Sequence, residues 1–153
     1  MKKFQYKMES VLQIKLKLED QAKSNYGIAR MRLNQEEEKL EQMAHKKTAY
    51  EDELRNLRMN RLNLLDIKMS EQAVEIMKTK MKQQAIVVRN SEHRLEVARI
   101  RLNDAMIDRK TQERLKEKAF EDYLLEFDSE ERKEVDELNS FNYNKPTFQE
   151  EDE

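Results

Sequence analysis

The chain has 153 residues, of which 41% are charged and 37% apolar, with one glycine, one proline and no cysteine. So few turn-forming residues exclude sandwiches and barrels. The lack of a glycine-rich loop excludes a doubly wound nucleotide-binding sheet, and the lack of cysteine excludes disulfide scaffolds and thiolate metal sites. The net charge of −2 is unevenly divided, because residues 1–30 carry +4, residues 31–120 carry +4 and residues 121–153 carry −10. Leucine, methionine and tyrosine recur regularly, which favours long helices that bury a narrow seam.

The first twenty residues begin with lysines but contain neither a continuous apolar segment nor a small-residue cleavage site. No run of about 18 apolar residues occurs, so we expect no direct membrane insertion. We therefore expect a cytoplasmic protein that starts at its mature N-terminus.

No helix breaker occurs between Gly27 and Pro146. One helix over this stretch would be roughly 177 Å long at 1.5 Å per residue. A hairpin is favoured instead, because each half then buries the apolar stripe of the other.

Two heptad seams support a hairpin. The first has twelve apolar residues at seventeen positions, and the second has ten at fifteen, both with the alternating 3–4 spacing of coiled coils. The first seam runs through Met8, Leu12, Lys15, Glu19, Ala22, Tyr26, Ala29, Leu33, Glu36, Leu40, Met43, Lys47, Tyr50, Leu54, Leu57, Arg61 and Leu64. The second runs through Val74, Met77, Met81, Gln84, Val88, Ser91, Leu95, Ala98, Leu102, Ala105, Arg109, Gln112, Lys116, Ala119 and Tyr123.

The register breaks between about residues 60 and 72, where Asn60, Asn63, Asp66 and Ser70 occur. The side chains of such residues compete for backbone hydrogen bonds and favour turns and helix N-caps. We predict the hairpin turn near 60–70, with Ser70 resembling the start of the second helix.

The antiparallel register is predicted by pairing positions whose numbers sum to 131. Met8 then faces Tyr123, and Lys47 meets Gln84 in a polar layer. Ala29 faces Leu102 in the same register. Lys15 facing Lys116 counts against this register and leaves a shift of one heptad open.

Beyond about residue 128 the second helix outruns the first, and its apolar stripe drifts. The fold class predicted is all-α, a long antiparallel two-helix coiled-coil hairpin. We expect a coiled-coil stalk over 1–141 and a disordered acidic tail over 142–153. The drifting stripe consists of Phe120, Leu124, Phe127, Val135, Leu138 and Phe141.

No catalytic, cofactor-binding or metal-binding constellation is present in the sequence. His45 and His93 have no second ligand at metal spacing. The basic stretch around Arg109 and Arg114 is interleaved with acids and has no aromatic platform, which favours a solvated mixed-charge face over a nucleic-acid site. We therefore expect no enzyme, no cofactor and no nucleic-acid partner.

Two stretches carry a resemblance to a known family. The chain opens on Phe4-x-Tyr6-x-Met8-Glu9-x-Val11-Leu12-x-Ile14-Lys15. Later it contains Glu113-Arg114-Leu115-Lys116-Glu117-Lys118, and then Lys133-Glu134-Val135-Asp136-Glu137-Leu138. Together they resemble the FliJ family of flagellar export proteins over roughly residues 1–141.

The resemblance implies a non-catalytic stalk of the flagellar type III export apparatus, cytoplasmic and peripheral at the inner face of the cell membrane. Its implied partners are the pore of the hexameric export ATPase, the cytoplasmic domain of the membrane export gate, and substrate chaperones. Gate contact is implied at Met43, Tyr50, Ala73 and Met77. The expected ATPase contacts gather at the end that holds both termini, namely Phe4, Tyr6, Arg109, Lys110, Arg114, Lys118, Phe120, Tyr123 and Phe127.

A different class of function stays open beside this one. A homodimeric coiled coil that only tethers or spaces its partners would have the same composition and heptads. Light scattering separates the two, because the stalk requires a monomeric hairpin.

Overall fold

The computed structural model describes residues 3–60 and 63–144, which form two helices, α1 (Glu9–Met59) and α2 (Leu64–Tyr143). No strand occurs within those two ranges, which confirms the all-α class. The chain divides into two units. Unit 1 comprises Met1–Leu16 and Asp108–Glu153, and unit 2 comprises Lys17–Ile107. The predicted tail lies largely in 145–153, outside the described residues, and Pro146 lies there too.

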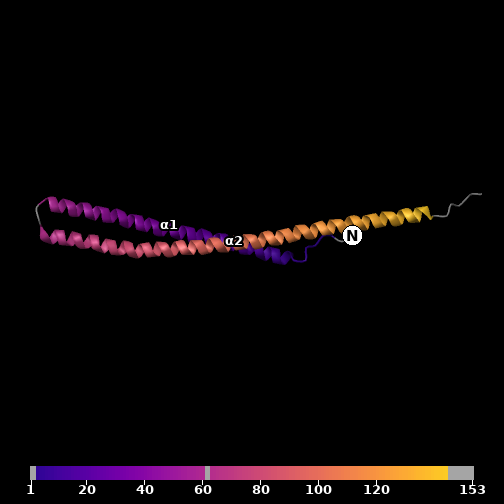
Figure 1. Cartoon of the computed structure of the whole chain (residues 1–153), viewed down its shortest axis with the longest axis horizontal. Coiled ribbons are helices and arrows are strands. Elements are labelled where there is room, and N and C mark those ends of the chain that lie inside the picture. The colour runs from indigo at the N-terminus through magenta and orange to yellow at the C-terminus, as the bar shows by residue number, and fades with distance from the viewer. Residues whose placement is uncertain (1–2, 61–62, 145–153) are drawn as a thin grey trace, which may run out of the picture. The chain divides into compact units, whose positions relative to one another are not determined.

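In unit 2, α1 and α2 run antiparallel on either side of a short turn (Figure 1). The first helix closes with the Asn60 amide donating to the Asn56 carbonyl at 3.1 Å. Asn63 caps the second helix: its side-chain oxygen accepts from the Leu65 amide at 3.2 Å, and its carbonyl accepts from the Ile67 amide at 3.0 Å.

The turn therefore lies within the predicted interval near 60–70, but Ser70 is not the helix start. Asn63 already satisfies amide groups that a helix N-terminus leaves without partners. Ser70 lies a full turn and a half inside α2, half-buried.

Both predicted seams are confirmed. Every seam position from Leu12 to Leu57 on α1, and every one from Val74 to Tyr123 on α2, is buried or half-buried. Met8 and Leu64, at the two ends of the first seam, are exposed, and Arg61 lies outside the described residues. The most deeply buried apolar side chains of the seams are those of Leu12, Leu33, Val74, Met77 and Val88.

The predicted register is wrong by eleven residues. Gln84 does not meet Lys47; its amide donates to the Glu36 carboxylate at 2.6 Å and to the Glu36 carbonyl at 3.0 Å. Likewise, Ala29 lies beside Ser91 rather than Leu102. The observed layers pair positions whose numbers sum to about 120, a shift of one and a half heptads rather than one.

The position of the turn explains most of this shift. The connection between Met59 and Leu64 is centred between residues 61 and 62, which corresponds to a sum of 123, whereas a sum of 131 requires a centre between 65 and 66. An error of a few residues in the turn is doubled in the pairing. In unit 1 the observed register also removes the predicted clash of two lysines, since Lys15 pairs with Asp108 at 3.4 Å and Lys116 with Glu9 at 2.9 Å.

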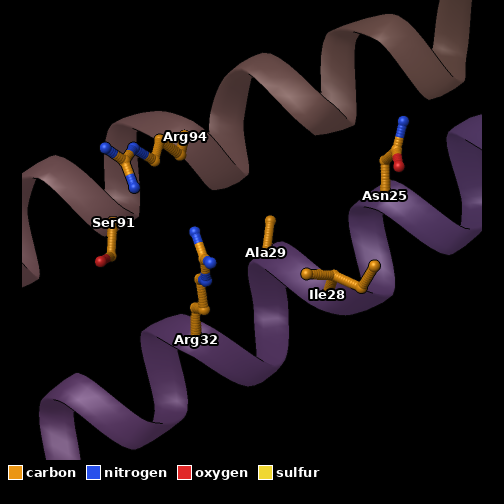
Figure 2. Close-up of a pocket in the computed structure, with 6 residues that line it drawn as sticks. All are labelled: Asn25, Ile28, Ala29, Arg32, Ser91 and Arg94. Atoms are coloured by element: carbon orange, nitrogen blue, oxygen red, sulfur yellow. The ribbon is translucent and has the colours of Figure 1, made fainter.

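Two grooves flank the seam of unit 2. The first, called here the open groove, contains a hollow of about 120 Å³ lined by Asn25, Ile28, Ala29, Arg32, Ser91 and Arg94. Figure 2 shows Arg32 reaching from α1 into the space between the two helices, whereas Arg94 lies along its own helix in the direction of Ser91. The groove contains four further bases at whole-heptad spacings from these arginines. Lys39 and Lys46 follow Arg32 on α1, and Lys80 and Arg101 lie before and after Arg94 on α2.

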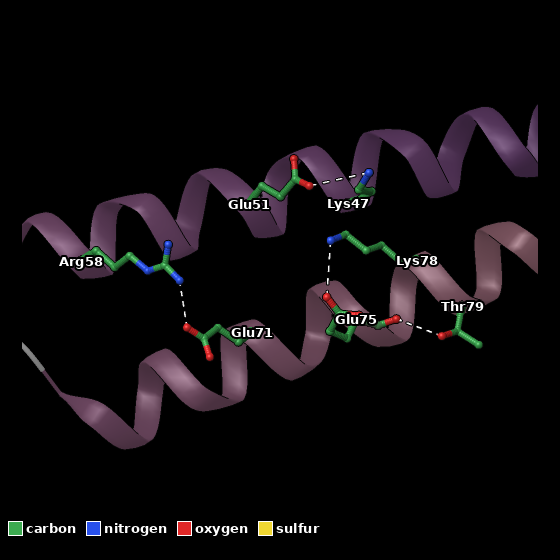
Figure 3. A network of polar contacts seen from close by, with 7 residues as sticks. All are labelled: Lys47, Glu51, Arg58, Glu71, Glu75, Lys78 and Thr79. Carbon is green, nitrogen blue, oxygen red and sulfur yellow. Dashed lines mark hydrogen bonds and ion pairs between the residues drawn. The ribbon is translucent and has the colours of Figure 1, made fainter.

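The other side of the seam, called here the paired groove, carries charges of both signs and one ion pair between the helices. The Arg58 guanidinium donates to the Glu71 carboxylate across it at 2.8 Å. Near that bridge, Lys47 pairs with Glu51 at 3.7 Å along α1, and Lys78 pairs with Glu75 at 3.4 Å along α2 (Figure 3).

No helix in residues 3–60 or 63–144 is long and apolar enough to cross a membrane.

Candidate functional site

The described residues hold no cluster of three or more His, Cys, Asp and Glu side chains that suits a metal ion. His45 is exposed beside Glu41 at 3.7 Å, and His93 is exposed on α2. The candidate functional sites described below are surfaces of the two units.

Aromatic rings from both ends of the sequence gather in unit 1. The ring of Phe4 meets Phe120 edge-on, with centroids 5.1 Å apart at 70°, and lies 5.4 Å from Tyr123. Tyr123 stacks on Phe120 at 6.2 Å and continues to Phe127 at 6.3 Å. Such edge-on and offset pairs contribute roughly 0.5–1.5 kcal/mol each beyond the buried area. Phe120 remains 43% exposed, so the cluster also presents ring surface to solvent.

Polar contacts to α2 hold the residues that follow Phe4 in the sequence. The Tyr6 hydroxyl donates to the Gln112 side-chain oxygen at 3.3 Å, and the Glu9 carboxylate binds the Lys116 ammonium at 2.9 Å. Gln13 also donates to Glu9 at 3.1 Å. The Lys116 ammonium, and then the Gln13 amide, lower the pKa of the Glu9 carboxyl below its ordinary value of 4.5. Phe4 thus reaches α2 because the residues after it are tied down.

The basic residues expected at this site divide into two groups. Lys110, Arg114 and Lys118 are exposed, and the last two border a shallow depression beside Leu115 and Thr111. Arg109 instead belongs to the seam: its side chain is 20% exposed and donates to Glu113 at 2.8 Å. A change at Arg109 would therefore disturb packing as well as surface charge.

The last turns of α2 carry exposed apolar side chains. From Asp128 to Tyr143 every residue is exposed, including Val135, Leu138 and Phe141. The drifting stripe predicted for this region is thus open to solvent, next in sequence to the aromatic cluster.

The residues expected to meet the export gate all lie in unit 2. Met43, Tyr50 and Ala73 are half-buried, and Met77 is 8% exposed. Glu36 and Gln84 contact each other across the seam. Met43 lies one heptad after Glu36 on α1, and Met77 lies one heptad before Gln84 on α2, so the two methionines lie at the same level of the antiparallel seam. Ala73 lies outside the seam positions, on the side of the open groove.

Sequence reasoning missed Gln112, Lys116 and Glu9 as partners of the N-terminal segment. The signal was present: the clash between Lys15 and Lys116 indicated that each lysine needed an acid, and Asp108 and Glu9 are the acids that a shifted register supplies.

Residues 4–147 match the protein-family model described as Flagellar FliJ protein. No curated protein and no solved structure matches the chain. The family match spans the aromatic cluster, both seams and the turn.

Proposed function

The chain belongs to the FliJ family of flagellar proteins, and on that premise we propose that it is a stalk that binds the pore of the hexameric export ATPase through unit 1. Membership makes it a component of flagellar protein export, in a family that is not catalytic. The finer role, contact with the ATPase and coupling to the membrane export gate, is the proposal.

One observation carries the proposal: the aromatic cluster of unit 1 is partly exposed to solvent and is followed in α2 by a charged helical segment with the exposed apolar side chains Val135, Leu138 and Phe141. Phe4, Phe120, Tyr123 and Phe127 are held in fixed mutual positions, so a partner meets a preformed surface. Exposed aromatic surface beside charge is typical of residues that dominate binding energy. The further members of the proposed ATPase contact are Tyr6, Lys110, Arg114 and Lys118, with Arg109 supporting them from the seam.

Gate contact is proposed for unit 2, through the half-buried edges of Met43, Tyr50 and Ala73. Met77 supports Met43 from within the seam. Binding that differs between the nucleotide states of the ATPase would shift their populations, which is how a stalk without catalytic groups stimulates turnover. Peripheral association with the inner face of the membrane, through the gate, and handling of substrate chaperones belong to the same proposal.

The test reverses exposed charge in unit 1. The variant Arg114→Glu/Lys118→Glu should weaken stimulation of the cognate ATPase about tenfold, corresponding to ~1.4 kcal/mol, because two attractions become repulsions. The control Lys82→Glu/Arg89→Glu changes the charge equally in unit 2 and should stimulate normally. ATP turnover is measured against concentration of the chain, with circular dichroism to verify helicity.

Full stimulation by the unit 1 variant would remove these bases from the contact. Light scattering of the wild-type chain addresses the homodimeric tether: a monomer supports the stalk, whereas a stable dimer without ATPase binding overturns it.

A further inference from the structure

The open groove carries basic side chains whose charge is only partly compensated within the hairpin, by the Glu36 carboxylate beside Lys39 and Arg32. Its six bases are Arg32, Lys39, Lys46, Lys80, Arg94 and Arg101, all exposed. Among the residues that the structure describes, only Lys39 of these six lies in an ion pair, with Glu36 at 3.2 Å. The remaining outward positions between the bases on this side of each helix are apolar, glutamine or asparagine.

The hollow within this groove is shaped by small seam residues. Ala29 and Ser91 share a layer, so two long side chains that would normally fill it are absent. Beside these two small residues it is lined by Asn25, Ile28, Arg32 and Arg94 (Figure 2). An apolar cavity of about 150 Å³ holds a benzene molecule, so about 120 Å³ suits one apolar side chain.

The spacing of the bases matches a helix. Along α1, Arg32, Lys39 and Lys46 recur every seven residues, or roughly 10.5 Å along the axis. On α2, Arg94 and Arg101 have the same spacing. A partner helix laid along the groove would meet a base with each two turns, and would bring its own apolar stripe over the hollow.

We propose that the open groove of unit 2 is a docking site for an acidic amphipathic helix of a partner protein. The partner helix inserts one apolar side chain between Ala29 and Ser91, and its carboxylates bind Arg32 and Arg94. The result is a local three-helix arrangement. This site is separate from the proposed ATPase contact, which lies in unit 1.

Charge and shape together favour a protein helix over other anionic partners. A membrane surface needs no hollow between two arginines. Single-stranded nucleic acid binds through stacking on aromatic rings, and the positions that line this groove carry none. Arginine also forms bidentate bonds with carboxylates, which the guanidinium groups of both helices offer here.

The probe is a labelled synthetic peptide of about three heptads with Leu at positions a and d and Glu at e and g. Repulsion between the Glu rows disfavours its self-pairing. Binding to the full chain is measured by fluorescence anisotropy at two salt concentrations. A matched peptide with Lys in place of Glu, vesicles of phosphatidylserine and phosphatidylcholine, and a short DNA duplex are measured beside it.

We expect the Glu peptide to bind, more weakly at high salt, and the Lys peptide not to bind. The variant Arg32→Glu/Arg94→Glu should lower the affinity about tenfold or more, whereas Arg30→Glu/Arg89→Glu, with the same change in net charge outside the groove, should lower it less than about twofold. Ala29→Leu, which fills the hollow without changing charge, should also weaken binding. Circular dichroism verifies that every variant remains helical.

Equal losses in the two double variants would overturn the proposal, because they would indicate non-specific attraction. Failure of the Glu peptide to bind would also overturn the proposal. So would a result in which vesicles or duplex DNA bind through Arg32 and Arg94 and the Glu peptide does not bind. Unchanged binding by Ala29→Leu would exclude the inserted side chain.

Discussion

The open and paired grooves lie on two sides of one seam and are formed by the same two helices, yet their charges differ. The paired groove mixes signs, with Arg58 bridged to Glu71 across it. The open groove places Arg32 near Arg94, and the further bases along it are Lys39, Lys46, Lys80 and Arg101. Like charges across a helix pair oppose its formation slightly. The charges of the paired groove are therefore explained by their contribution to the stability of the hairpin, whereas those of the open groove are not. This makes the open groove the better candidate for a partner-binding surface.

The seam between the grooves should dominate stability. Leu33, which is 7% exposed, and Arg32, its exposed neighbour in the open groove, provide a matched pair. Leu33→Asp should destabilise the hairpin by about 3–5 kcal/mol, because an unpaired charge enters the seam. Arg32→Gln should change stability by less than about 0.5 kcal/mol. Urea unfolding followed by circular dichroism measures both, and similar effects would mean that the burial pattern is wrong.

Reversing one charge should change the stability of the hairpin in opposite directions in the two grooves. Arg94→Glu creates a cross-helix attraction to Arg32 and should stabilise the chain by roughly 0.2–1 kcal/mol. Glu71→Arg opposes Arg58 with a like charge and should destabilise it by a similar amount. Thermal unfolding at low salt makes the comparison. Because exposed charges are screened, both effects should shrink in about 1 M salt; a stabilising Glu71→Arg would refute the assignment of the two grooves.

The smallest expected effect is on the stability of the hairpin at acidic pH. Hydrogen bonding from Gln84, and then Lys39, lowers the pKa of the Glu36 carboxyl below its ordinary value of 4.5. A lowered folded pKa contributes stability that is present above pH 4.5 and is lost as the pH falls through the lowered value. Glu36→Gln should therefore flatten the acid limb of the stability curve slightly below pH 4.5. An unchanged acid limb, measured by unfolding at stepped pH, would contradict this.

Heptad spacing was enough to predict which residues are buried. Even the polar seam residues Glu19, Gln84 and Ser91 were placed correctly, because position on a helix, rather than residue type, decides which side chains face the partner helix. Register was not predictable in the same way. Apolar seams of this kind fit several registers almost equally well, and specific polar contacts select one of them: the Asn63 cap, the Gln84–Glu36 hydrogen bonds, and the pairs Lys15–Asp108 and Glu9–Lys116.

The candidate site was predicted in part. The aromatic residues were found because Phe and Tyr are scarce and recur at both ends of the paired segments, and Phe4, Phe120, Tyr123 and Phe127 do come together. Arg109 was predicted both at a seam position and among the ATPase contacts, and it lies at the seam, paired with Glu113. The open groove was missed, since recognising it requires knowing which outward positions of α1 and α2 share a side, and that depends on the register.

The short connection at Asn63 also sets the order in which the chain assembles. Arg58 and Glu71 are 13 residues apart in sequence, whereas Tyr6 and Gln112 are 106 apart. Closing the larger loop directly costs about 2 kcal/mol more in chain entropy, at roughly 0.6 kcal/mol for each doubling of length. Pairing that begins beside the turn shortens the remaining loop with every layer formed. During synthesis, both sides of the turn become available before Phe120 and Tyr123 do, so we expect the helices to pair beside the turn before Phe4 meets these rings.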